Sequence, residues 1–249
     1  MENIIKGLTI LGLLLMSFSD IGMAQNTRDT RDQSHLWLVL NGNTKLNDCF
    51  SIFHDFQFRR DDLGATWQQL LLRAGLTYKI NDAVSATAGY GFVETHPYGD
   101  FPVANTFPEH RIWEQLQFKQ TIGKMSFISR YRLEQRMIGN SATGEFQPYR
   151  FENRMRYMGR FAIPLVTKED KKLSAVVYDE IFVNFGKNVG RNTFDQNRLF
   201  AGFNYAFSPK VAIEIGYLNH MVQLRTLTAT NLQKFENNHT LMVTNTLNF

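Results

Sequence analysis

Charged side chains recur at every second position in several segments, most clearly in residues 150–161. There Arg150, Glu152, Arg154, Arg156 and Arg160 alternate with a second row that is mainly aromatic, aliphatic or small. Neighbouring side chains of a strand point to opposite faces, so this spacing predicts one strongly charged face. Arginine donates several hydrogen bonds from a planar, permanently charged group, and carboxylates can accept them in pairs. The chemistry expected on such a face is ion pairing and the attraction of anions.

The same alternation places further charged residues on the enclosed face of a barrel. Arginines outnumber acids there. Two consequences compete: the residues fill a narrow barrel with ion pairs and hold its wall in register, or they line a porin-like pore biased toward small anionic solutes. Besides Arg150 and Arg160, the predicted lumen-lining charged network consists of Arg111, Arg130, Arg132, Glu134, Arg136, Glu152, Arg154, Arg156, Glu180, Arg198 and Glu214.

Three histidines support a different alternative, an outer-membrane lipid hydrolase. His220 is expected to face inward near a strand end, while His96 and His110 flank one long loop. Hydrolysis needs a serine or an activated water beside such a histidine, and a third polar group that orients it. No serine stands at a matching height, so we assign no catalytic residues. Cys49 is the only cysteine, and phosphate-binding or metal-binding motifs are absent from the sequence, so no cofactor is expected.

Strands must position these faces. Beyond the N-terminal apolar run, two-residue alternation recurs over nearly the whole remaining chain, and no apolar stretch there approaches the roughly 20 residues of a membrane helix. The predicted fold is all-β, a transmembrane antiparallel up-and-down barrel of about 10 to 12 strands. Bacterial barrels have an even number of strands. Either a short strand within residues 25–33 makes twelve, or the first segment lies outside the wall and leaves ten. Eleven segments carry the pattern: 34–42, 46–59, 66–80, 83–95, 110–122, 125–138, 150–162, 173–185, 195–207, 211–222 and 238–249.

Connection lengths favour a membrane barrel over a water-soluble sandwich. Alternation alone cannot distinguish these two folds, because both have it. Outer-membrane barrels have short turns on the periplasmic side and long loops outside, and a sandwich has no reason to sort its loops in this way. The segment 164–172 is intermediate and is the one departure from the rule. Long connections at 97–109, 139–149, 186–194 and 224–237 alternate with short ones at 81–82, 123–124 and 208–210.

The N-terminal residues have the pattern of a bacterial export signal. Lys6 precedes an apolar run over 7–18, and the small residues Gly22 and Ala24 predict cleavage after Ala24. A retained anchor is the alternative, but the run is too short to span a bilayer. Cleavage changes the formal charge of +4 to +5, because one base and two acids are lost. The predicted domains are a signal peptide over 1–24, a flexible leader over 25–33 and an outer-membrane β-barrel domain over 34–249.

The expected partners follow from this location. The chain has no run of consecutive lysines and arginines that would indicate nucleic-acid binding, so we expect no nucleic-acid partner. Outer-membrane lipid should cover the apolar faces. The ending, in which Leu241, Val243, Leu247 and Phe249 are spaced by two or four residues, looks like the terminal signal by which bacterial barrel proteins are recognised by their insertion machinery.

Four strings resemble an uncharacterised family of outer-membrane barrel proteins from Bacteroidota, known only as a domain of unknown function. The resemblance implies a barrel fold and an outer-membrane location, and it supplies no activity or catalytic residues. The function expected from the sequence is therefore an outer-membrane barrel of structural or pore-forming type. The strings are EHRIWEQL at 109–116, RYRLEQR at 130–136, DEIFVNF at 179–185 and DQNRL at 195–199.

Overall fold

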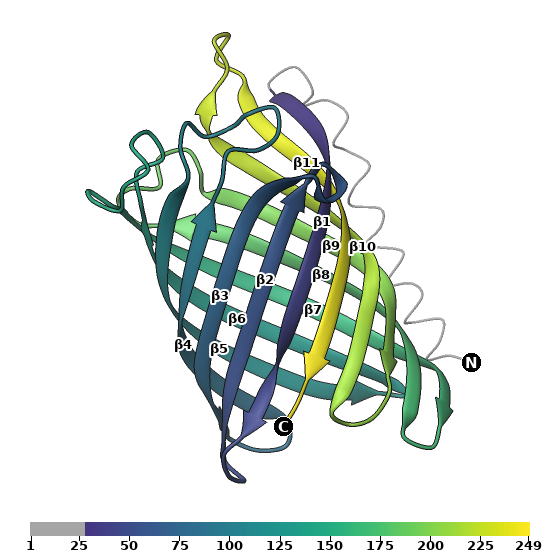
Figure 1. Cartoon of the computed structure of the whole chain (residues 1–249). Coiled ribbons are helices and arrows are strands. Elements are labelled where there is room, and N and C mark those ends of the chain that lie inside the picture. The colour runs from purple at the N-terminus through teal and green to yellow at the C-terminus, as the bar shows by residue number, and fades with distance from the viewer. Residues whose placement is uncertain (1–27) are drawn as a thin grey trace.

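The computed structural model describes residues 28–249 as a single closed barrel of eleven strands (Figure 1). The predicted all-β barrel is confirmed, and each of the eleven predicted segments forms a strand. The strands are β1 (Arg28–Lys45), β2 (Phe50–Asp61), β3 (Thr66–Lys79), β4 (Val84–Thr95), β5 (Phe107–Ile122), β6 (Met125–Ile138), β7 (Arg150–Lys168), β8 (Lys171–Phe185), β9 (Phe194–Ala206), β10 (Val211–Leu227) and β11 (Gln233–Leu247), with a short 3-10 turn, η3 (Asp62–Gly64), between β2 and β3.

The barrel closes between its first and last strands. Consecutive strands pair antiparallel, whereas β1 pairs with β11 in parallel, with Leu36 opposite Leu241. The expectation of an even number of strands in a fully antiparallel wall was therefore wrong. When consecutive strands alternate in direction and their number is odd, the first and the last strand run in the same direction. The barrel can then close only by pairing these two strands in parallel.

The start of β1 also differs from the prediction. Residues 28–33, expected to be a flexible leader or a separate short strand, continue β1 and pair with β11 from Gln233 to Asn238. Backbone hydrogen bonds to the long β11 hold this polar segment extended, although its side chains show no apolar alternation. The predicted signal peptide and its cleavage site after Ala24 lie outside the residues that the structure describes.

The two ends of the barrel differ in their connections. One end, where the C-terminus lies, has turns of two to four residues and is called the turn side; the other has connections of four to eleven residues and is called the loop side. The segment 164–172 departed from the predicted sorting only because its strands were drawn too short: β7 and β8 extend into it and leave a turn at residues 169–170. Likewise β10 and β11 shorten the predicted loop 224–237 to residues 228–232.

Side chains sort in opposite directions across the wall. Each of the eleven strands exposes at least one large apolar residue, whereas buried polar and charged residues outnumber buried apolar ones. Apolar packing inside is confined mainly to one cluster that includes Trp37, Phe200 and Met242. Gly202 and Gly216 make room for Phe200, because a Cβ at either would lie within 2.8 Å of its ring. No helix in residues 28–249 is long and apolar enough to cross a membrane.

Candidate functional site in the barrel lumen

The structure places the whole predicted lumen-lining network on the inner face of β5 to β10. Nine of its residues are buried, and Arg130 and Arg136 are half-buried but turn toward interior carboxylates. The members are thus brought together, although they come from strands that are distant in the chain. The buried members are Arg111, Arg132, Glu134, Glu152, Arg154, Arg156, Glu180, Arg198 and Glu214.

Glu134 on β6 is the centre of a continuous chain of ion pairs. Its two oxygens accept hydrogen bonds from Arg154 at 2.5 Å and from Arg156 at 2.7 Å. Arg156 also donates to Glu180 at 2.8 Å, and Arg154 donates to Asp195 at 2.7 Å. Carboxylates that accept from two arginines keep both charges compensated away from water. This chain of ion pairs ties the neighbouring strands β6, β7, β8 and β9 together along the inner face of the wall.

Each remaining acid of the network also holds an arginine. Glu152 pairs with Arg150 at 2.7 Å and with Arg225, and Glu214 pairs with Arg160. Glu109, which we did not predict, lies 2.6 Å from both Arg111 and Arg136. The charged face therefore consists largely of paired groups.

Three buried arginines are exceptions to this pairing. Among residues 28–249, no carboxylate lies within 4.0 Å of Arg59, Arg132 or Arg198. Their guanidinium groups donate instead to neutral glutamine oxygens, at 2.6 Å for Arg59 and Arg132 and 3.0 Å for Arg198. Each also lies over an indole ring: Arg59 and Arg198 are 4.0 and 5.0 Å from the Trp37 ring centre, and Arg132 is 4.7 Å from that of Trp113. Cation–π contacts and neutral acceptors leave these positive charges without a counterion.

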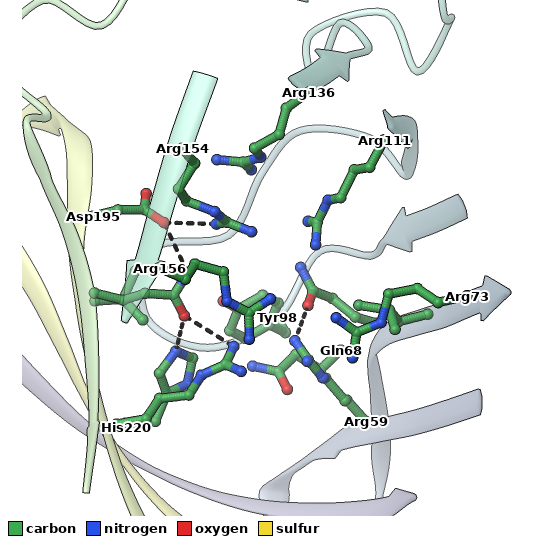
Figure 2. Close-up of a pocket in the computed structure, with 15 residues that line it drawn as sticks. Arg59, Gln68, Arg73, Tyr98, Arg111, Arg136, Arg154, Arg156, Asp195 and His220 are labelled. Carbon is green, nitrogen blue, oxygen red and sulfur yellow. Dashed lines mark hydrogen bonds and ion pairs between the residues drawn. The ribbon is translucent and has the colours of Figure 1, made fainter. Parts of the chain in front are cut away.

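Two cavities lie in the part of the interior that residues 28–249 enclose. The loop-side cavity has a volume of about 150 Å³ and the turn-side cavity about 170 Å³. Arg73, Arg156 and Arg198 line both, so they form the partition between them. The loop-side cavity is lined by seven arginines, several of which turn toward one central space in Figure 2, and by a single carboxylate. These are Arg59, Arg73, Arg111, Arg136, Arg154, Arg156 and Arg198, with Asp195.

A loop covers the loop-side cavity. The connection between β4 and β5, residues 96–106, brings Tyr98 to the cavity wall, where its hydroxyl donates to Glu236 at 3.2 Å. The next residue, Gly99, donates its backbone N–H to Asp61 at 3.1 Å. Burial, together with the nearby charge of Glu236, raises the pKa of Tyr98 well above its usual value, so the hydroxyl keeps its proton as a donor.

The three candidate histidines lie at separate places. His220 faces inward as expected, and its Nε2 is 2.6 Å from the Gln196 amide oxygen. His96 has Glu94 and the Thr106 hydroxyl as partners, at 3.1 and 3.2 Å. His110 lies on the outer face with the Tyr90 hydroxyl against its Nδ1. Within residues 28–249, none of the three has a serine as its hydrogen-bond partner, so the arrangement expected of a lipid hydrolase is not assembled around them.

Sequence reasoning missed part of the interior on β1 to β3. Asp55, Gln57, Arg59 and Asp61 occupy alternate positions of β2 and all face inward, a signal that was present in the spacing. Arg73, paired with Asp55 at 3.0 Å, was hidden because leucines precede it on both faces of β3. His35 and Trp37 belong to the same region, where Gln68 contacts both, at 3.2 and 2.8 Å.

Comparison with known proteins adds a family but no activity. A family model described as a protein of unknown function, DUF2490, matches residues 34–231. An uncharacterized protein of Methylorubrum extorquens is 35% identical over 159 residues, which are 61% of this chain and 62% of that protein. The match thus spans less than two thirds of the relative's length.

Proposed function

This chain belongs to the DUF2490 family of proteins of unknown function, and from its geometry we propose that it is an outer-membrane β-barrel with a closed, arginine-rich lumen. The observation that carries the proposal is the reversed sorting of side chains. Phe203, Ile112 and Leu241 are 57%, 51% and 48% exposed, and comparable residues occur on every strand around the wall. Soluble monomers rarely expose a continuous apolar surface of that extent, whereas lipid covers it favourably.

Polar groups on the outer wall are compatible with lipid contact because they satisfy one another. The Asn197 amide donates to Asp179 at 2.7 Å, and the Asn237 amide donates to Asp32 at 2.7 Å. Tyrosine–histidine pairs, Tyr90 with His110 and Tyr217 with His239, also lie on this surface. Aromatic residues with a polar tip suit the boundary between hydrocarbon and headgroups.

A closed body is favoured over an open pore. The two cavities are separated by the partition of Arg73, Arg156 and Arg198, and Tyr98 covers the loop-side one. The lumen is thus filled by the protein's own side chains, as in narrow barrels.

Two experiments test this proposal. Fractionation of cells should recover the chain with outer-membrane proteins, and its extraction should require detergent; a monomer that stays folded in plain buffer would overturn the membrane location. Reconstituted in planar bilayers, the wild-type barrel should show no steady conductance, and a steady current through it would overturn the closed lumen.

Passage of small anions is the second candidate function, because the partition between the cavities is itself made of arginines. Movement of these side chains would join the cavities into one positively charged path, which favours anions. Truncating the partition in the double variant Arg73→Ala/Arg198→Ala should then produce an anion-selective conductance. A folded double variant that remains silent, or that prefers cations, would exclude this candidate. The export signal and the resemblance to Bacteroidota proteins stay predictions.

A further inference from the structure

The unpaired arginines of the loop-side cavity suggest that a ligand belongs there. Arg59 and Arg198 are 5% and 9% exposed, and both lie over the ring of Trp37. Two like charges held out of water in one place are costly unless a counterion compensates them. The part of the chain that the structure describes provides none within 4.0 Å of either.

An unused donor lies at the same cavity. The Nε of Arg198 is buried without a hydrogen-bond partner in residues 28–249. Figure 2 shows Arg59, Arg73, Arg111, Arg154 and Arg156 arriving from several sides and turning into one space. Asp195, the one carboxylate that residues 28–249 contribute to the cavity wall, already accepts hydrogen bonds from Arg154 and from the amides of Asn184 and Gln196.

The dimensions restrict the ligand. A cavity of about 150 Å³ is well below the roughly 300–1,000 Å³ of pockets that take drug-sized ligands, so its size suits a compact anion better than a nucleotide or a sugar phosphate. Donors that converge from several directions suit an acceptor with oxygens on all sides, and guanidinium groups match such oxyanions well.

We propose that the loop-side cavity is a binding site for one inorganic tetrahedral oxyanion, phosphate or sulfate, held by Arg59 and Arg198. The anion supplies the missing negative charge between these two groups and accepts the hydrogen bond that the Nε of Arg198 leaves unused. The inference rests on the enclosed lumen of the proposed function. It is independent of the membrane location, because binding is measured on the folded chain in detergent.

Equilibrium dialysis tests the site directly. The full chain, purified in detergent without phosphate or sulfate, should bind about one labelled phosphate per barrel, and unlabelled sulfate should compete for it. Arg59→Gln and Arg198→Gln should each weaken binding at least about tenfold, since each removes charge-assisted hydrogen bonds. Arg132→Gln is the matched control: it removes another buried arginine that lacks a carboxylate but does not line the cavity. Absence of saturable binding by the wild type, or unchanged binding by both cavity variants, would overturn the proposal.

Thermal unfolding provides a second, independent readout. Without phosphate, Arg59→Gln should unfold at or above the wild-type temperature, because it removes one of two mutually repelling buried charges. Phosphate should then raise the wild-type midpoint, relative to chloride at equal ionic strength, and raise that of Arg59→Gln clearly less, because the variant binds phosphate more weakly. An equal shift in both proteins would show a nonspecific salt effect and contradict the site. Failure of either test with normal outer-membrane fractionation would reject the anion site alone.

Discussion

The two halves of the lumen enclose cavities of similar size with different chemistry. The turn-side cavity has five arginines and three carboxylates, and apolar residues such as Val39, Met158 and Met242 complete its wall. The loop-side cavity has seven arginines and one carboxylate. Paired charges and apolar packing are what a wall-stabilising interior requires. An excess of buried positive charge serves no packing purpose, so the contrast separates a structural half from a half suited to bind something.

The largest effect should come from removing the acid that compensates the arginines at the junction of the two halves. Glu134 is fully buried and holds both Arg154 and Arg156, so Glu134→Ala removes the carboxylate that the two arginines share and leaves the buried chain of ion pairs with one uncompensated positive charge. The unfolding free energy in detergent should fall by about 3–5 kcal/mol. Chemical denaturation followed by intrinsic fluorescence measures it. Glu114→Ala, which removes an outward-facing glutamate whose one side-chain partner within residues 28–249 is Gln135, is the control and should cost far less; similar losses in both would contradict the central role of Glu134.

A smaller effect should come from disturbing the apolar packing of the structural half. A Cβ on Gly202 would lie 2.4 Å from the Ile215 carbonyl oxygen and 2.8 Å from the Phe200 ring. Gly202→Ala should therefore lower the unfolding free energy by about 1–3 kcal/mol through overpacking. Gly159→Ala on β7, whose Cβ would have no neighbour closer than 3.6 Å, is the matched control and should be tolerated. Equal stability of the two variants would indicate a less tightly packed turn side.

The loop 96–106 beside the loop-side cavity should contribute less to the unfolding free energy than the packing around Gly202. Tyr98→Phe removes the hydroxyl that donates to Glu236 and should cost about 1 kcal/mol. The pKa of Tyr98 is raised in the folded protein, so its protonated form adds stability that is complete below pH 10 and is lost as the pH rises through the folded-state pKa. Stability measured between pH 8 and pH 12 should thus fall more in the wild type than in Tyr98→Phe. Parallel pH profiles would show that the hydroxyl does not make this contact.

The smallest effect on stability should come from charged residues of the turns, which lie outside both halves of the lumen. Lys79 and Asp82 pair at 2.5 Å, but their side chains are 52% and 97% exposed. Water screens such pairs, so Lys79→Ala should leave the unfolding midpoint unchanged within error. A clear loss, especially one insensitive to added salt, would mean that the turn side depends on its surface charges as well as its interior.

Sequence periodicity was sufficient to predict the eleven strands, because alternation indicates which residues face the lumen. It could not predict which arginine pairs with which carboxylate. That Arg154 reaches both Glu134 and Asp195 depends on the register of β6, β7 and β9, and no spacing within one strand contains this information. The parallel seam was missed for a related reason: the polar residues 28–33 carry no alternation, and only their partner β11 shows that they form a strand.

The parallel seam between β1 and β11 also places the first and the last described residues at opposite ends of the barrel. Arg28 lies at the loop side and Phe249 at the turn side, so a peptide joining them would have to run the height of the wall. At roughly 3.3 Å per residue, a linker alongside the 15-residue β11 needs about fifteen residues. Circular permutation by a short linker, feasible when both ends meet on one rim, is therefore ruled out here. In the proposed membrane setting, labels beside Arg28 and Phe249 would be accessible from opposite compartments.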